Sequence, residues 1–130
     1  MKRISTDQII EIHKRLIGQS GGAEGIRDIN LLDSAVRSPF QTFGGIDLYP
    51  NLYAKASQMG YQLINNHPFL DGNKRIGIHV LFLFLRINGE VIDAADDEKI
   101  SLGLGIARGD LKPEDVYRWL ETHSRPYQFL

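Results

Sequence analysis

The chain has 130 residues, of which 42% are hydrophobic and 24% charged, a balance that suits one globular domain with a buried core and excludes a second domain. Its formal net charge of -1 disfavours a dedicated DNA- or RNA-binding module, because such a module needs a basic surface to neutralise phosphates. The lack of cysteine excludes disulfides, thiolate metal sites and a cysteine nucleophile, and it fits a reducing cytoplasm, which is the expected location.

The first segment predicts a helix followed by a glycine-rich loop. No apolar signal region follows Met1, so we expect the mature chain to begin there. Ser5-Thr6-Asp7-Gln8 has the spacing of a capping box, and apolar residues then recur at helical intervals as far as Ile17. Gly18 and the Gly21-Gly22 pair are expected to end this helix, and residues 21–28 are expected to form a loop.

The next two helices enclose a segment without helical period. Asn30 can cap a short second helix, which should end before Pro39 because a residue ahead of proline avoids helical geometry. Residues 38–49 contain turn-prone glycines and predict an extended flap or a small hairpin. Pro50 suits the first turn of a third helix, whose apolar stripe ends at Asn65-Asn66.

A fourth helix is predicted from Asn73 to Asn88. It is apolar on almost every face between residues 76 and 85, which indicates burial on all sides. This stretch is shorter than the roughly 20 apolar residues of a membrane helix, so no membrane segment is expected.

Two further helices complete the prediction. Asp96 can cap a fifth helix, Arg108-Gly109-Asp110 should end it, and Pro113 should open a sixth. The tail, residues 124–130, is expected to be loosely held. The predicted fold class is therefore all-α, with residues 1–130 forming a single domain of about six helices around a buried central helix.

The residues from His67 to Arg75 read His-Pro-Phe-Leu-Asp-Gly-Asn-Lys-Arg and join the third predicted helix to the start of the fourth. Gly72 lets the backbone approach a ligand closely, and the first helical turn after it presents unpaired N–H groups to an anion. The cations at 74 and 75 oppose the helix dipole unless an anion is bound there. These features predict a phosphate-binding loop made of Gly72, Asn73, Lys74 and Arg75.

Two more side chains of the loop could take part in chemistry. Asp71 is a hard oxygen ligand of the kind that Mg²⁺ takes together with nucleotide phosphates and water. His67, with an unperturbed pKa of about 6.5, could accept a proton from an attacking hydroxyl. The predicted catalytic residues are His67, Asp71, Lys74 and Arg75, with Asp71 as the metal ligand.

Ordinary structural roles are the alternative for several of these residues. Taken singly, the Asp71-Gly72 pair is a common turn and Asn73 a helix cap. His79 is expected to be a satisfied core histidine, and His13 and His123 to be packing or surface residues.

The loop closely resembles the signature of Fic-domain proteins, in the variant carried by death-on-curing (Doc) toxins. The resemblance extends to residues 25–28, 31–35 and 39–45, and covers roughly residues 1–123. It implies an all-helical, Fic-like fold and transfer from ATP, with Mg²⁺, to a hydroxyl of a target protein. His67 would then be the base, Asp71 the metal ligand, and Phe69 an anchor for the loop.

Most Fic relatives transfer AMP, but this chain departs from them at two positions. It has Lys74 where they carry glycine, and Ile78 where they carry a second arginine. Lysine adds bulk and charge where the alpha-phosphate would lie, so the gamma-phosphate is expected to face the hydroxyl. The resemblance thus implies a toxin kinase that phosphorylates threonine or serine, on translation elongation factor Tu, and blocks translation.

The resemblance also implies a Phd-like antitoxin that inhibits the enzyme in trans. Residues 20–25 match a Ser-x-x-x-Glu-Gly pattern of self-inhibition, but Glu24 stands in a glycine-rich stretch where a helix is costly, so the match is interpreted as coincidence. AMP transfer and a non-catalytic interaction module stay open as alternatives, and direct nucleic-acid binding is not expected.

Overall fold

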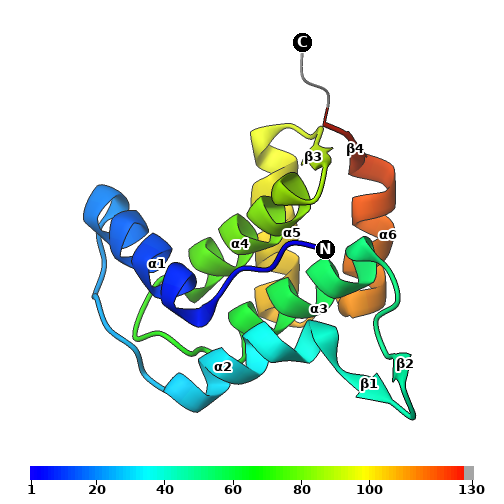
Figure 1. The fold of residues 1–130 in the computed structure, drawn as a ribbon. Helices are drawn as coiled ribbons and strands as arrows, with labels where there is room; N and C mark the ends of the chain where they lie inside the picture. Colours follow the sequence, from blue (N-terminus) through cyan, green and yellow to red (C-terminus); the bar gives the residue numbers. More distant parts are fainter. Residues whose placement is uncertain (128–130) are drawn as a thin grey trace.

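The computed structural model describes residues 1–127, and it confirms an all-α fold (Figure 1). Six α-helices make up most of this part of the chain: α1 Thr6–Ser20, α2 Ile29–Arg37, α3 Leu52–Asn65, α4 Asn73–Ile87, α5 Asp96–Arg108 and α6 Pro113–His123. The remaining regular elements are a short 3-10 helix, Ser38–Phe40, and four short strands: β1 Thr42–Phe43, β2 Ile46–Asp47, β3 Glu90–Ile92 and β4 Ser124–Pro126.

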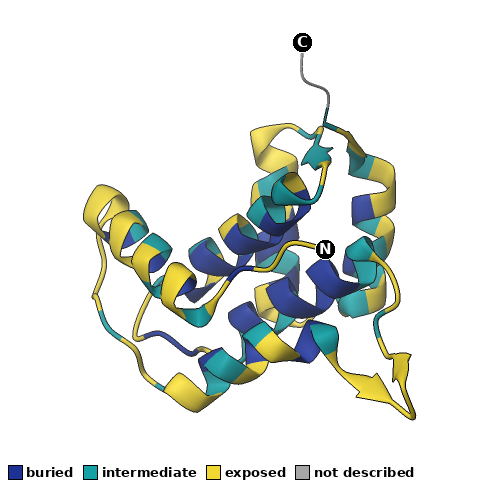
Figure 2. Ribbon diagram, in the orientation of Figure 1, coloured by how far each residue is buried: buried dark blue, intermediate teal, exposed yellow. Residues whose placement is uncertain are grey.

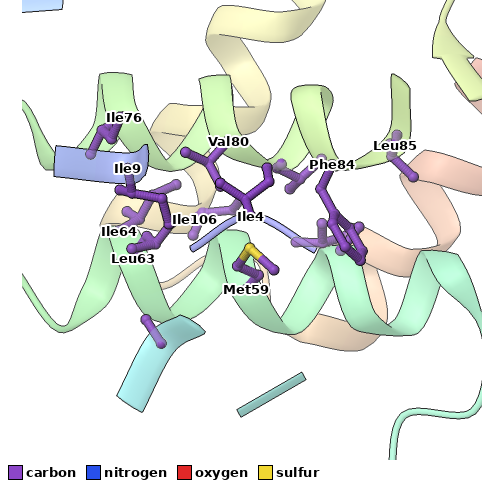
Figure 3. Packing of buried hydrophobic residues seen from close by; sticks show 14 of the residues in the cluster. Ile4, Ile9, Met59, Leu63, Ile64, Ile76, Val80, Phe84, Leu85 and Ile106 are labelled. Atoms are coloured by element: carbon purple, nitrogen blue, oxygen red, sulfur yellow. The ribbon is translucent and has the colours of Figure 1, made fainter. Parts of the chain in front are cut away.

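Helices α3 and α4 lie side by side at the centre of the molecule. Side chains of α4, including Val80 and Phe84, face Met59 and Leu63 of α3 (Figure 3). Helices α1, α2, α5 and α6 surround this pair (Figure 1). Since α3 ends and α4 begins beside the same loop, the central pair of the core also positions the motif that the sequence singles out.

Burial of α4 is one-sided, which corrects the prediction of burial on all faces. Its buried residues include Ile76, Val80 and Phe84, whereas Lys74 and His79 are exposed (Figure 2). His79 is therefore not the core histidine that the sequence predicted. An apolar run of ten residues does not distinguish a fully buried helix from one that leaves a narrow stripe uncovered.

The capping box of α1 forms as predicted, and of the two predicted stops the Gly21-Gly22 pair ends the helix whereas Gly18 does not. The Ser5 hydroxyl accepts a hydrogen bond from the Gln8 N–H, and the Gln8 side chain accepts one from the Ser5 N–H. The helix continues through Gly18 and ends at Gly21, whose φ of 85° suits glycine. A single glycine in a helix costs only about 1 kcal/mol, so the packing of the helix overrides it.

Two predicted caps are displaced by one or two residues, and one helix begins later than predicted. The Asp28 carboxylate, and not Asn30, caps α2 by accepting the N–H groups of residues 30 and 31. Asn51 caps α3, so Pro50 lies just outside the helix and not in its first turn. Ala95 precedes α5, so Asp96 is its first residue and not its cap. Several capping residues stand together in each case, and sequence alone does not select among them.

The predicted hairpin is present between α2 and α3. Strands β1 and β2 pair in an antiparallel manner, and the hairpin exposes Phe43 and Ile46 to 80% and 74%. The buried Lys55 of α3 fixes the ends of the hairpin. The Lys55 ammonium donates to the Tyr49 and Pro39 carbonyl oxygens and contacts the Asp47 carboxylate. The hairpin precedes α3, whereas the motif follows α3 at the other end (Figure 1).

The end of the described chain is better ordered than the sequence predicts. Strand β4 pairs with β3, and the Tyr127 N–H donates to the Gly89 carbonyl oxygen. The rest of the predicted loose tail, residues 128–130, lies outside the described residues. Across residues 1–127, no helix has both the length and the apolarity needed to cross a membrane.

Candidate active site

The loop between α3 and α4, together with the first turn of α4, lines a shallow hollow of about 400 Å³. Its lining comprises every predicted site residue, together with Leu70: His67, Leu70, Asp71, Gly72, Asn73, Lys74 and Arg75. The structure thus brings the predicted residues to one place, although their contacts differ sharply.

His67 follows Asn66, the C-cap of α3, and stands in an unusual backbone conformation. Its φ of 49° is the only positive value at a non-glycine residue within 1–127. Such residues are uncommon, and they persist where the surrounding structure holds them. The His67 ring is exposed at the hollow, where it can meet a hydroxyl from another molecule.

Gly72 opens α4 in the left-handed region, with φ 75° and ψ 20°. Any side chain there would be strained and would also meet Ile17 Cδ1 at 3.1 Å. No side chain caps α4, so the N–H groups of its first turn, in residues that line the hollow, have no helical acceptor. This arrangement attracts anions.

Asn73 is buried, with 8% of its surface exposed, and its side chain is fully engaged. The Asn73 amide donates to the Phe69 carbonyl oxygen and accepts from the Phe69 N–H, both at 3.0 Å. These bonds close the loop around Phe69, which is itself buried. Of the predicted phosphate binders, Asn73 can therefore offer only its backbone N–H.

The Asp71 carboxylate is exposed and ionised. Hydrogen bonds from the Ala23 and Gly72 N–H groups hold the pKa of Asp71 below its usual value, and the nearby Arg75 and His13 lower it further. Each carboxylate oxygen accepts one of these bonds, so lone pairs remain for a cation.

Magnesium fits this arrangement through a single protein carboxylate. Within residues 1–127, no three His, Cys, Asp or Glu side chains gather in a way that could hold a metal ion. Mg²⁺ commonly takes one or two carboxylates and completes its shell with phosphate oxygens and water. Asp71 could supply the protein ligand of such an ion.

The two cations of the motif have different surroundings. The Arg75 guanidinium donates to the Ser20 hydroxyl and, at 2.9 Å, to the Gly21 carbonyl oxygen, so it joins α4 to the end of α1. Lys74 is exposed and has no ion pair or hydrogen bond from its ammonium to any described residue. Lys74 is thus a free positive charge in the first turn of a helix.

Sequence reasoning missed the part that His13 plays in this loop. His13 is only 2% exposed; its ring stacks on Phe69 with centroids 3.8 Å apart, and its Nε2–H donates to the Asp71 carbonyl oxygen at 2.8 Å. The available signal was its helical spacing of four residues from both Ile9 and Ile17, which are buried. The other predicted packing histidine, His123, stacks on Trp119 and contacts Glu98.

Comparisons with known proteins relate the chain to one family. The Fic/DOC family model matches residues 3–85. Toxin Doc of Mycolicibacterium smegmatis is 43% identical over 77 residues, which are 59% of this chain and 59% of that relative. Protein kinase doc of Escherichia phage P1 is 28% identical over 117 residues, 89% of this chain and 90% of that relative.

Proposed function

The chain belongs to the Fic/DOC family, and from this premise we propose that it is a toxin-type protein kinase. It transfers the gamma-phosphate of ATP to a threonine or serine hydroxyl of a bacterial protein, and the proposed target is translation elongation factor Tu. Modification of that factor would block translation. The name of the phage P1 relative, a protein kinase, supports this choice among the activities of the family.

The observation that carries the proposal is the free charge of Lys74. A cation in the first turn of a helix is unfavourable by a few tenths to about 1 kcal/mol unless an anion is bound there. No described carboxylate neutralises Lys74. A nucleotide phosphate bound to the N–H groups of α4 would do so, and Lys74 would then stabilise charge that develops during transfer.

The surroundings of Lys74 also favour phosphate transfer over AMP transfer. Ile78 occupies the position of the second arginine of AMP-transferring relatives, and it packs with the Lys74 stem around Gly103. Phe82 stands one turn further along α4, and the Lys99 ammonium of α5 lies 6.0 Å from its ring centroid. The lysine and arginine side chains that line the hollow itself are those at 74 and 75, both in the first turn of α4.

The remaining roles follow from the contacts. His67 would accept the hydroxyl proton of the target as oxygen attacks the gamma-phosphorus, and ADP would leave. Asp71 would hold Mg²⁺, which when bound would supply positive charge to neutralise the phosphates. Arg75, anchored to α1, would fix the loop and offer its remaining N–H groups to phosphate.

An incubation of the protein with elongation factor Tu and gamma-labelled ATP tests the proposal. We expect label in the target and a gain of one phosphate in its intact mass. His67→Ala should lower the rate about a hundred- to ten-thousand-fold, while Lys14→Met, a change at an exposed lysine of α1, should retain it. A gain of one adenylate would establish AMP transfer instead, and no modification by a folded protein would contradict both.

The proposed partner is an antitoxin of Phd type, which would restrain the enzyme in trans. The name of the M. smegmatis relative, a toxin, supports such a pairing. If the chain were a non-catalytic interaction module, His67→Ala would leave its toxicity in cells unchanged. Loss of toxicity in that variant, with an unchanged level of folded protein, supports the enzyme.

A further inference from the structure

Arg27 lies in the loop between α1 and α2, forty positions before His67, and its side chain contacts the motif directly. Its Nε donates to the His67 carbonyl oxygen at 2.5 Å, and its Nη2 donates to the Asn66 carbonyl oxygen at 2.7 Å. The guanidinium fork therefore engages two consecutive peptide groups. Such two-point contact fixes orientation as well as distance.

The backbone of the same segment extends this contact to a third carbonyl. The N–H groups of Arg27 and Asp28 both donate to the Pro68 carbonyl oxygen, at 2.8 and 3.0 Å. Three successive carbonyl groups, at 66, 67 and 68, thus turn toward residues 27 and 28. With its carbonyl held on that side, the peptide of His67 has little freedom to rotate.

The left-handed backbone conformation of His67 is unfavourable for a residue with a side chain, so it needs contacts such as those of Arg27 to persist. A left-handed residue just after a helix is usually glycine, because a side chain there costs roughly 1–2 kcal/mol. In this chain the position carries the imidazole that faces the hollow. Restraint of the backbone at 67 therefore decides where the imidazole is aimed.

We propose that Arg27 is a positioning residue, which holds His67 in its left-handed conformation and so aims the imidazole at the incoming hydroxyl. This inference rests on the proposed kinase function. Arg27 is exposed and contacts neither Asp71 nor the first turn of α4 in the described structure. Its loss should consequently affect the chemical step and leave nucleotide binding intact.

Arg27→Met and Arg27→Lys test this inference, with Arg37→Met as the matched control. Arg37 is an exposed arginine at the end of α2, and its closest carboxylate contact is 4.0 Å. We expect Arg27→Met to lower kcat roughly ten- to a hundredfold with KM for ATP within about twofold, because a displaced base slows transfer alone. Arg27→Lys, which can reach one carbonyl but not both, should lie between Arg27→Met and the wild type.

A second measurement separates this inference from the proposed function. The carbon chemical shifts and the N–H to Hα coupling of His67 in NMR spectra report its backbone conformation without any activity. We expect the left-handed values in the wild type and in Arg37→Met, and a shift away from them in Arg27→Met. If no target is phosphorylated but these spectra change, the proposed function fails, while the hold of Arg27 on the backbone conformation of His67 stands.

Four results would overturn the positioning role. The first is a left-handed His67 in Arg27→Met together with an unchanged kcat. The second is an equal loss of kcat in all three variants, and the third is a loss of kcat that only follows a loss of folded protein by circular dichroism. The fourth is a KM for ATP that rises in step with the loss of kcat.

Discussion

Polar side chains of the motif divide into those whose hydrogen bonds are used within the protein and those that remain available. The Asn73 side-chain amide both donates to and accepts from the Phe69 backbone, and Arg75 is hydrogen-bonded to the end of α1. His67 and Lys74 have side chains that face the hollow without a partner among the described residues. Buried polar groups need such partners, whereas reactive groups need to be free to meet a ligand.

Stability measurements should separate the two kinds of residue. Asn73→Asp replaces a donor by an acceptor opposite the Phe69 carbonyl oxygen, so we expect the free energy of unfolding to fall by about 1–3 kcal/mol. Lys74→Met removes an uncompensated cation from the start of α4, and should leave that free energy unchanged or raise it by up to about 1 kcal/mol. Urea denaturation of both variants, followed by circular dichroism, measures the difference.

Lys74, which we expect to be dispensable for stability, should be required for activity. Lys74→Met should abolish most phosphate transfer while the protein remains at least as stable as the wild type. This combination would be expected of a residue that serves a ligand and not the fold. A large loss of stability in Lys74→Met would show instead that an acidic partner within the chain holds the lysine.

At the scale of single elements, helix termini combine local signals with contacts that the sequence does not display. The predicted capping box of α1 is present because all of its partners lie within four residues. At the start of α5, Glu98 accepts the Ala95 N–H and also meets His123 of α6 at 3.0 Å. The first contact is local and predictable, whereas the second depends on how two helices pack.

The Glu98 contacts predict a dependence of stability on pH. The hydrogen bonds from the Ala95 N–H and the His123 ring lower the pKa of Glu98 below its ordinary value of 4.5. A depressed pKa in the folded state stabilises the protein above pH 4.5, and this contribution is lost as pH falls through the folded pKa. The unfolding temperature of the wild type should therefore exceed that of Glu98→Gln near neutral pH, and the difference should shrink on acidification.

Thermal unfolding between about pH 7 and pH 2 tests this dependence. Glu11→Gln, at an exposed position of α1 for which only a 3.6 Å contact with Lys14 occurs, serves as the matched control. Its difference from the wild type should be small at every pH. A constant difference between wild type and Glu98→Gln across this range would show that the carboxylate charge contributes nothing to the α5–α6 contact.

At the scale of the whole molecule, the sequence predicts features whose contacts are close along the chain. It does not predict features whose contacts join residues far apart in the sequence. Six helices, the hairpin and the nine-residue motif depend on neighbours in sequence, and all were predicted. His13 and Asp71 are 58 positions apart, Arg27 and His67 are 40 apart, and strand β4 pairs with a strand more than thirty residues earlier. These contacts arise only from packing, so neither the roles of His13 and Arg27 nor the β3–β4 pair could be predicted.

Close packing of α3 against α4 joins the core to the motif. A Cβ at Gly60 would lie 2.5 Å from Leu81 Cδ1, and a Cβ at Gly77 would overlap Ile64 Cγ1 and come within 3.4 Å of the Gly60 carbonyl oxygen. Carbon atoms in contact normally lie about 3.5–4 Å apart. The two helices can approach this closely only because both positions lack side chains.

Gly77→Ala tests this approach, because two effects of the substitution have opposite signs. Alanine favours a helix over glycine by about 1 kcal/mol, whereas overpacking of a buried contact costs about 1–3 kcal/mol. Ile64 is buried and β-branched, so its side chain cannot readily move away from the added methyl group. We therefore expect net destabilisation of about 1–2 kcal/mol. Gly18→Ala in α1, where no atom lies within 4 Å of the added methyl group, should instead stabilise the protein by up to about 1 kcal/mol.

Because α3 ends and α4 begins at the motif, Gly77→Ala should also lower phosphate transfer by more than its loss of folded protein explains. Ile64→Ala, which removes the clashing atom, should destabilise less in the Gly77→Ala background than in the wild type, as urea denaturation of all four proteins would measure; strictly additive effects would mean that the two helices do not depend on this contact.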